Sequence, residues 1–184
     1  MPQSKLALFA IGIVMLLSLQ QARHAMRTQT EKVDIEVTAM ATQVGIDRLN
    51  EMRLLAFDET TKDGRIMSAS ELSSLLPLPS DPEHLFDSFP ERQAAHSAGP
   101  DVEADDLDDF DAVTNTVSRT TRLDTLHFSV DSVVGYVLDT SLGTTSTVPT
   151  GFKKVFIRVT ALGIQPAVSV TLSQLYSCGT RCAW

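Results

Sequence analysis

Residues 6–19 read LALFAIGIVMLLSL, an uncharged run that follows Lys5 and precedes Arg23. At about 1.5 Å rise per residue, a helix of this run covers roughly 21 Å, which is shorter than the roughly 30 Å hydrocarbon core of a membrane. We therefore expect neighbouring polypeptides to bury it, at least in part. The residues expected to form this assembly surface are Leu6, Leu8, Phe9, Ile11, Ile13, Val14, Leu16, Leu17 and Leu19.

A secretory signal peptide is the alternative interpretation of this run, because Lys5 supplies a positive charge before an apolar segment of suitable length. A cleavage site with two small residues does not follow, since Gln20 lies two positions before Ala22 and Arg23 lies two positions before Ala25. The sequence therefore favours a retained membrane or filament-core segment over a cleaved signal.

The composition limits the classes of function. A length of 184 residues leaves room for one domain with an appendage, which argues against a multidomain enzyme. The net charge is −8, and without a basic patch the chain does not attract a phosphate backbone, so nucleic acid is not expected as a partner. The four histidines are scattered, and neither a nucleophile motif nor a glycine-rich phosphate loop accompanies them. We expect neither an active site nor a small-molecule substrate.

The first third of the chain, residues 1–57, is predicted to form one long helix. No proline interrupts residues 6–57, and helix-compatible residues predominate. Beyond the apolar run, Val33, Val37 and Val44 recur at helical spacing, so the second half of the helix has one apolar face. That face requires a partner within the domain.

Residues 122–184 are predicted to form an antiparallel β head. Apolar and polar residues alternate in 126–130, 155–159 and 168–172, and a further strand is predicted over 133–138, after a turn near Asp131-Ser132. A sheet with one apolar face complements the apolar face of the helix. We therefore predict an α+β fold in which the second half of the helix packs on a four-stranded antiparallel sheet.

The segment 58–121 is predicted to be a long irregular acidic loop, because prolines and glycines recur in it. Seven carboxylates fall within residues 101–111, and like charge at this density needs cations or arginines to neutralise it. Calcium is one candidate, and no other cofactor is expected. Its ligands would be Asp105, Asp106, Asp108 and Asp109.

The spacing of these carboxylates is not that of an EF-hand. Asp106 stands where that calcium loop needs glycine, and Ala112 stands where it needs a bidentate glutamate. The alternative to a bound cation is a solvated acidic face, or one that pairs with Arg119 and Arg122.

Cys178 and Cys182 are the two cysteines of the chain, and they follow the last predicted strand. A local disulfide between them suits a domain outside the cytoplasm, where such bonds persist. Two free thiols are the alternative. A metal site is not expected at this pair, because no neighbouring histidine supplies further ligands.

The order of these segments resembles the type IV pilin-like proteins, and within them the minor pilins and pseudopilins. The resemblance covers most of the chain and is carried by the apolar helix, its ending Ala56-Phe57-Asp58-Glu59, and the segment Asp105-Asp106-Leu107-Asp108-Asp109-Phe110 before an antiparallel sheet. The chain is divergent in this respect: it begins Met1-Pro2-Gln3-Ser4-Lys5, without a recognisable prepilin leader site, and Lys5 stands where the family has a glutamate.

The resemblance implies a non-catalytic structural subunit that coheres through its N-terminal helix in an extracellular filament or envelope assembly. Its partners would be other copies of itself or related pilin-like subunits, and the membrane during biogenesis. It would lie in the inner membrane or cell envelope with its C-terminal head outside the cytoplasm, or in an extracellular filament. Two alternatives stay open: a single-pass membrane-anchored accessory subunit of a membrane complex, and an anchored calcium-dependent adhesion or binding module.

Overall fold

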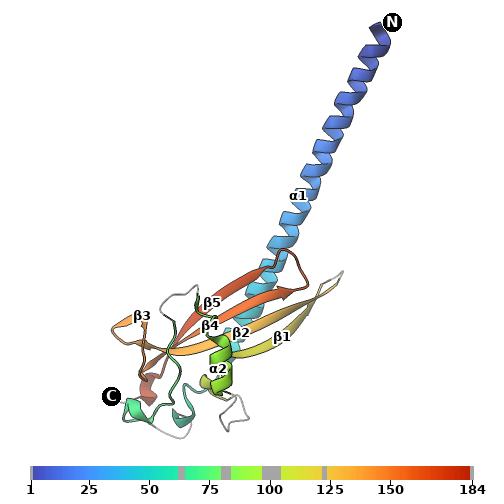
Figure 1. The fold of residues 1–184 in the computed structure, drawn as a ribbon. Coiled ribbons are helices and arrows are strands. Elements are labelled where there is room, and N and C mark those ends of the chain that lie inside the picture. Colours follow the sequence, from blue (N-terminus) through green and yellow to red (C-terminus); the bar gives the residue numbers. More distant parts are fainter. Residues whose placement is uncertain (1, 62–64, 80–83, 97–104, 122–123, 183–184) are drawn as a thin grey trace. The chain divides into compact units, whose positions relative to one another are not determined.

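The computed structural model describes residues 2–61, 65–79, 84–96, 105–121 and 124–182, without the side chains of residues 2–12, 30, 95, 96 and 181. It contains a long N-terminal helix and an antiparallel sheet, so the predicted α+β class is confirmed. The chain divides into two compact units, Met1–Ala39 and Met40–Trp184. The described part of the first unit is helical, and the second unit contains the sheet (Figure 1).

Helix α1 spans Pro2–Met52 and contributes residues to both units. It ends before the predicted end at Phe57, because the chain tightens there into a single turn in which each N–H donates to the carbonyl three residues earlier instead of four. The Leu54 N–H donates to the Glu51 carbonyl at 3.1 Å, and the Leu55 N–H donates to the Met52 carbonyl at 3.2 Å. This turn ends the helix and redirects the chain.

The sheet contains β1 (Val113–Thr120), β2 (Thr125–Leu138), β4 (Phe152–Leu162) and β5 (Ser169–Ser177) in the order β1-β2-β4-β5, and β3 (Ser141–Thr145) pairs with β2. All pairings are antiparallel, and β1 and β5 lie at the edges of the sheet (Figure 1). Tyr136 lies opposite Lys153, which lies opposite Tyr176. Residues directly opposite each other in antiparallel strands share a face, so these three side chains lie on the same side of the sheet.

Strand β2 is one continuous strand, which corrects the prediction of two strands separated by a turn. The residues from 130 to 137 are all buried, so both faces of this part of the strand are covered and the sequence does not alternate there. Asp131 and Ser132, where the turn was predicted, have partners instead. Arg158 Nη2 donates to Asp131 Oδ2 at 2.9 Å, and Ser132 Oγ donates to the Phe110 carbonyl at 2.7 Å.

Two regular elements lie within residues 58–121, which corrects the prediction of an irregular loop there. Strand β1 has the largely polar sequence VTNTVSRT, which suits an edge strand but weakens the alternation that predicts one. Helix α2 (Phe89–His96) carries Pro90 in its first turn, where proline is tolerated, although proline elsewhere indicates a loop. Single turns of 3-10 helix are η1 (Glu59–Thr61), η2 (Ala69–Glu71), η4 (Asp108–Phe110) and η5 (Gly179–Arg181).

Residues of α1 within the second unit contact the sheet. A Cβ atom added to Gly45 would lie 2.5 Å from Leu172 Cδ1 and 3.3 Å from Val159 Cγ2, so the Leu172 side chain would have to move to admit a larger residue here. The Tyr176 hydroxyl donates to the Leu49 carbonyl at 2.8 Å. These contacts lie on the face of the sheet that also holds Lys153.

On the opposite face of the sheet, described residues from the segment between η2 and α2 pack against β2. Leu78 and Leu85 of this segment form a buried cluster with Val133 and Val137 of β2. The partly buried rings packed against that cluster are Phe86, Phe89, Phe152 and Phe156. The sheet therefore has two apolar faces, whereas the sequence predicted one.

Substitution of Gly135 by alanine tests the close packing on this second face. A Cβ at Gly135 would lie 2.4 Å from Leu78 Cγ, whereas a Cβ at Gly143 would meet nothing within 4 Å. We expect Gly135→Ala to lower the free energy of unfolding by about 1–3 kcal/mol through overpacking. Gly143→Ala is the control and should change it by less than about 0.5 kcal/mol, as measured by urea denaturation. Equal effects of the two substitutions would contradict the packing.

Candidate functional site

Lys153 occupies an inward position of strand β4. Buried residues alternate with partly exposed ones along this strand, and Lys153 belongs to the same series as Val155, Ile157 and Val159. Its side chain is 0% exposed. An ammonium group removed from water needs both an opposite charge and hydrogen-bond acceptors, so the surrounding chain must supply both.

The Lys153 Nζ atom finds acceptors in two segments that are distant in the sequence. It donates to the Phe57 carbonyl at 2.6 Å, to Asp58 Oδ2 at 3.1 Å and to Asp108 Oδ1. Its three N–H bonds therefore all have an oxygen acceptor. The ring centroids of Phe57 and Tyr136 lie 4.6 and 5.1 Å from the same nitrogen, so aromatic rings complete its surroundings.

A parallel bridge between Ala56 and Asp106 brings the two acidic segments together. The Ala56 N–H donates to the Asp105 carbonyl at 3.2 Å, and the Leu107 N–H donates to the Ala56 carbonyl at 3.1 Å. Asp58 lies two residues after one member of the bridge and Asp108 two residues after the other. The backbone pairing thus delivers both carboxyl groups to the same lysine.

Asp58 is a buried carboxylate with several donors. Its Oδ1 accepts from the Thr60 hydroxyl at 2.8 Å, and its Oδ2 accepts from the Ser73 N–H at 3.0 Å and from the Tyr136 hydroxyl at 3.2 Å. Burial raises the pKa of this carboxyl, but the charge of Lys153 and the hydrogen bonds outweigh burial and lower the pKa to about 2. Asp58 is therefore ionised and forms the principal ion pair with Lys153.

Asp108 and Asp106 have a different electrostatic environment. Burial, together with the charges of Asp106 and Asp58, raises the pKa of Asp108 to about 8 despite the contact with Lys153. Burial and the charge of Asp109 raise the pKa of Asp106. One lysine cannot keep all these adjacent carboxyl groups ionised, so Asp108 retains a proton near neutral pH.

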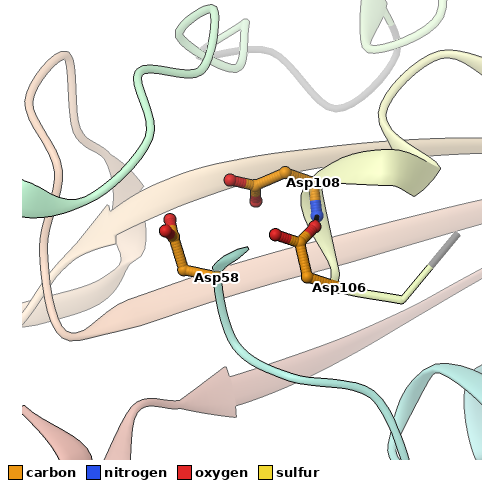
Figure 2. A group of neighbouring side chains, drawn as sticks. All are labelled: Asp58, Asp106 and Asp108. Atoms are coloured by element: carbon orange, nitrogen blue, oxygen red, sulfur yellow. Dashed lines mark hydrogen bonds between the residues drawn. The ribbon is translucent and has the colours of Figure 1, made fainter. Parts of the chain in front are cut away.

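Asp58, Asp106 and Asp108 form the candidate site, and Figure 2 shows their carboxyl groups turned toward a common space. Each offers one oxygen, and these oxygens lie within 4.8 Å of one another, a spacing that could hold a metal ion. Lys153 Nζ contacts two of the three carboxyl groups, however, and supplies a positive charge there. The lysine thus takes the place of a cation.

The structure unites two of the four residues predicted as calcium ligands. Asp106 and Asp108 belong to the site, whereas Asp109 Oδ2 accepts from the N–H groups of Asp105 and Asp106 at 2.9 and 3.1 Å and so holds the local backbone. The third carboxyl group of the site is that of Asp58, which was not predicted as a ligand. The acidic segment alone therefore does not form the cluster.

Arg92 of α2 forms a second buried ion pair. Its Nη1 donates to the two carboxylate oxygens of Asp111 at 2.9 and 3.0 Å, and its Nη2 donates to the carbonyls of Leu76 and Pro77 at 2.7 and 2.6 Å. The Arg92 side chain is 1% exposed. This pair ties α2 and the segment before it to the residues that precede β1.

The arginines that were predicted to neutralise the acidic run have other positions. Arg119 pairs with Asp47 of α1, and Arg122 lies outside the described residues, as do residues 101–104. In the described part of the acidic run, Lys153 of β4 pairs with Asp108 and Arg92 of α2 pairs with Asp111.

The remaining predicted residues concern the disulfide and the assembly helix. The predicted disulfide between Cys178 and Cys182 is confirmed, with 5.6 Å between their Cα atoms. The exposed members of the assembly surface are Ile13, Val14, Leu16, Leu17 and Leu19. The members whose side chains lie outside the description are Leu6, Leu8, Phe9 and Ile11. Within the described part of the chain, no helix has the length and apolar character needed to cross a membrane.

Two residues of the site, Lys153 and Asp58, were not predicted from the sequence. A signal for Lys153 was present, because the alternation of Val155, Ile157 and Val159, extended by one step toward the N-terminus, places Lys153 on the buried side. Asp58 had no such signal, since it follows a helix and nothing in its spacing connects it with the acidic segment. Its partner depends on long-range backbone pairing.

Comparison of the chain with protein-family models, with curated proteins and with solved structures found no match. The resemblance to type IV pilin-like proteins rests on the order of segments in the sequence and stays a prediction. The exposed apolar residues of α1 and the buried charges of the head are therefore the features of this chain that bear on its function.

Removing Arg92 tests whether the second buried ion pair holds the head together. We expect Arg92→Met to lower the free energy of unfolding by about 3–5 kcal/mol, because Asp111 would be left buried and unpaired. Arg119→Met removes an exposed pair and is the matched control, with an expected loss of about 1 kcal/mol or less. Chemical denaturation of the full chain measures both, and a loss for Arg92→Met no larger than that of the control would refute a structural role.

Calcium titration tests whether Lys153 replaces a metal ion. Since the lysine already neutralises the site, millimolar calcium should shift the melting temperature of the full chain by less than about 1 °C relative to chelator. A stabilisation of several degrees that disappears in Asp106→Asn, but persists in the exposed control Asp124→Asn, would show that the three carboxyl groups hold calcium.

Proposed function

We propose that this protein is a non-catalytic structural subunit that coheres through the first half of α1 into a pilin-like extracellular filament or envelope assembly. One observation carries the proposal: α1 exposes large apolar side chains between Ile13 and Leu19. The exposed fractions are 44% for Ile13, 64% for Leu16 and 59% for Leu19. Successive helix residues point about 100° apart, so seven of them cover every direction, and a helix that is apolar all round is normally buried.

The covering surface is proposed to be the same run in neighbouring copies. The apolar run extends about 21 Å as a helix, less than the roughly 30 Å of a hydrocarbon core, so other polypeptides suit it better than lipid alone. Burial of each large apolar side chain contributes on the order of 1.5–3 kcal/mol. A few neighbouring helices would therefore hold a subunit firmly.

The second half of α1 is proposed to pack on the sheet and to connect the assembly helix to the head. Two contacts support this role: the close approach of Gly45 to Leu172, and the hydrogen bond from Tyr176 to the Leu49 carbonyl. The acidic segment is proposed to belong to the head and to be neutralised largely within it. A head compensated in this way can be displayed outside the cytoplasm on the assembled helices.

A single-pass membrane-anchored accessory subunit is the second candidate. The exposed apolar residues of α1 would also be buried in a membrane where lipid covers part of the helix and other subunits cover the rest. The anchored calcium-dependent adhesion or binding module is less favoured. Its support is the spacing of the three carboxyl groups, and Lys153 already supplies a positive charge at that place.

Adding one charge to the apolar run tests the proposed assembly. We expect Leu16→Asp to raise the protein concentration needed for assembly at least about tenfold, because a carboxylate would have to be buried among apolar helices. Val148→Asp is the matched control, since Val148 is an exposed apolar residue of the head, and it should leave assembly unchanged. Sedimentation of the full chain after detergent removal, with negative-stain microscopy of the pellet, measures both.

The outcomes separate the two candidates. Filaments or regular oligomers of the unsubstituted chain that Leu16→Asp abolishes would support the structural subunit. Monomers that enter lipid vesicles, without any oligomer at any concentration tested, would refute self-assembly and favour the anchored accessory subunit.

A further inference from the structure

The pair formed by Lys153 and Asp108 is more enclosed than a surface ion pair. The Lys153 side chain is 0% exposed and that of Asp108 is 14% exposed. Lys153 Nζ contacts Asp108 Oδ1, while Oδ2 of the same carboxyl group is buried without a hydrogen-bond partner among the described residues. We propose that Lys153 Nζ and Asp108 Cγ become joined by an amide bond, an internal cross-link that folding itself brings about.

The position of Lys153 suits a nucleophile. An amine attacks in its uncharged form, and the Asp58 carboxylate, 3.1 Å from Lys153 Nζ, is placed to take the proton that must leave the nitrogen first. The rings of Phe57 and Tyr136 flank the nitrogen, and the register of β4 with β2 fixes the lysine beside Tyr136. The amine is thus held against a carboxyl group, which supplies the proximity that an intermolecular reaction lacks.

Asp108 rather than Asp58 is the electrophile, because the two carboxyl groups have different partners. Asp58 accepts hydrogen bonds from Thr60, Ser73 and Tyr136, which stabilise its ionised form and make its carbon a poor target. Asp108 has the lysine on one oxygen and, among the residues that the structure describes, no hydrogen-bond partner on the other. This second oxygen is the one that can leave.

Asp58 is placed to move the protons of the reaction, since its Oδ2 lies 3.1 Å from Lys153 Nζ. It accepts a proton from the ammonium, the nitrogen attacks Asp108 Cγ, and a C–N bond forms. The bond from Cγ to Oδ2 then breaks, and the oxygen leaves as water with the proton that Asp108 already carries and one of the three ammonium protons. A second ammonium proton is passed through Asp58 to solvent, and the third stays on the amide nitrogen. One ammonium and one carboxylic acid thus give one amide, one water and one released proton, without an oxidant or co-reactant.

The cross-link has a defined structural consequence. It would join strand β4 to Asp108 at the start of η4 and enclose β1, β2 and β3 in one covalent ring. A ring of this kind limits the unfolded states of the enclosed strands and so stabilises the folded head. The inference is independent of the proposed function, because it concerns only residues within the second unit.

Mass spectrometry of the full chain decides the proposal. Under reducing and denaturing conditions the chain should be lighter than its sequence by about 18 Da, the mass of one water lost on amide formation. Proteolysis should yield a branched peptide in which Lys153 is joined to Asp108. An intact mass that equals the sequence mass, or a digest in which both residues occur only in linear peptides, would overturn the proposal and leave an ion pair.

Two variants exclude other losses of water, such as succinimide formation at the Asp63-Gly64 dipeptide. Lys153→Arg keeps a positive charge beside Asp58, and the measured mass of this variant should equal the mass calculated from its own sequence. Lys154→Arg is the matched control, because that lysine lies on the other face of β4 over the Phe156 ring, and it should keep the loss of about 18 Da. Persistence of the loss in Lys153→Arg would place the dehydration elsewhere and refute the cross-link.

Discussion

The ammonium of Lys153 inside the head is the constraint on which the neighbouring segments depend. Burying such a charge alone costs several kcal/mol, so the fold is stable only when acceptors are brought to it. The ending of α1 at Met52 and the bridge from Ala56 to Asp106 are the backbone features that deliver them. Asp58 and Asp108 then reach the lysine from two sides of that bridge. One inward residue of β4 thus contacts both the segment that follows the helix and the acidic segment.

Local patterns predicted the parts of the fold that depend on neighbouring residues. Alternation predicted β4 and β5, the absence of proline predicted α1, and the spacing of Cys178 and Cys182 predicted the disulfide. The failures occurred where tertiary contacts override local pattern. Strand β2 is covered on both faces and so does not alternate, and β1 is polar because it lies at an edge. Neither the continuous strand β2 nor the edge strand β1 can be predicted from the sequence without knowing which residues cover each strand.

The candidate site divides in the same way. Asp106 and Asp108 belong to a run of acidic residues that is evident from the sequence. A neutralising partner could therefore be predicted, but not which residue supplies the positive charge. The position of Lys153 could be predicted from the alternation in β4, since a lysine in a series of buried aliphatic residues needs an acidic partner. Asp58 was not readable, because its position depends on a bridge between residues about fifty positions apart. Such pairing has no local signature, and only the three-dimensional arrangement reveals it.

The two units of the chain present opposite chemistry to their surroundings. In the second unit, the buried cations Lys153 and Arg92 have acidic partners within the same unit, so these charges require nothing from outside. In the first unit, the residues between Ile13 and Leu19 expose apolar surface that a single chain leaves uncovered. The helix, and not the head, is therefore the part of the chain that needs another molecule to bury its apolar surface. Under the proposed function, the helix would govern cohesion between subunits, while the surface of the head could vary without loss of assembly.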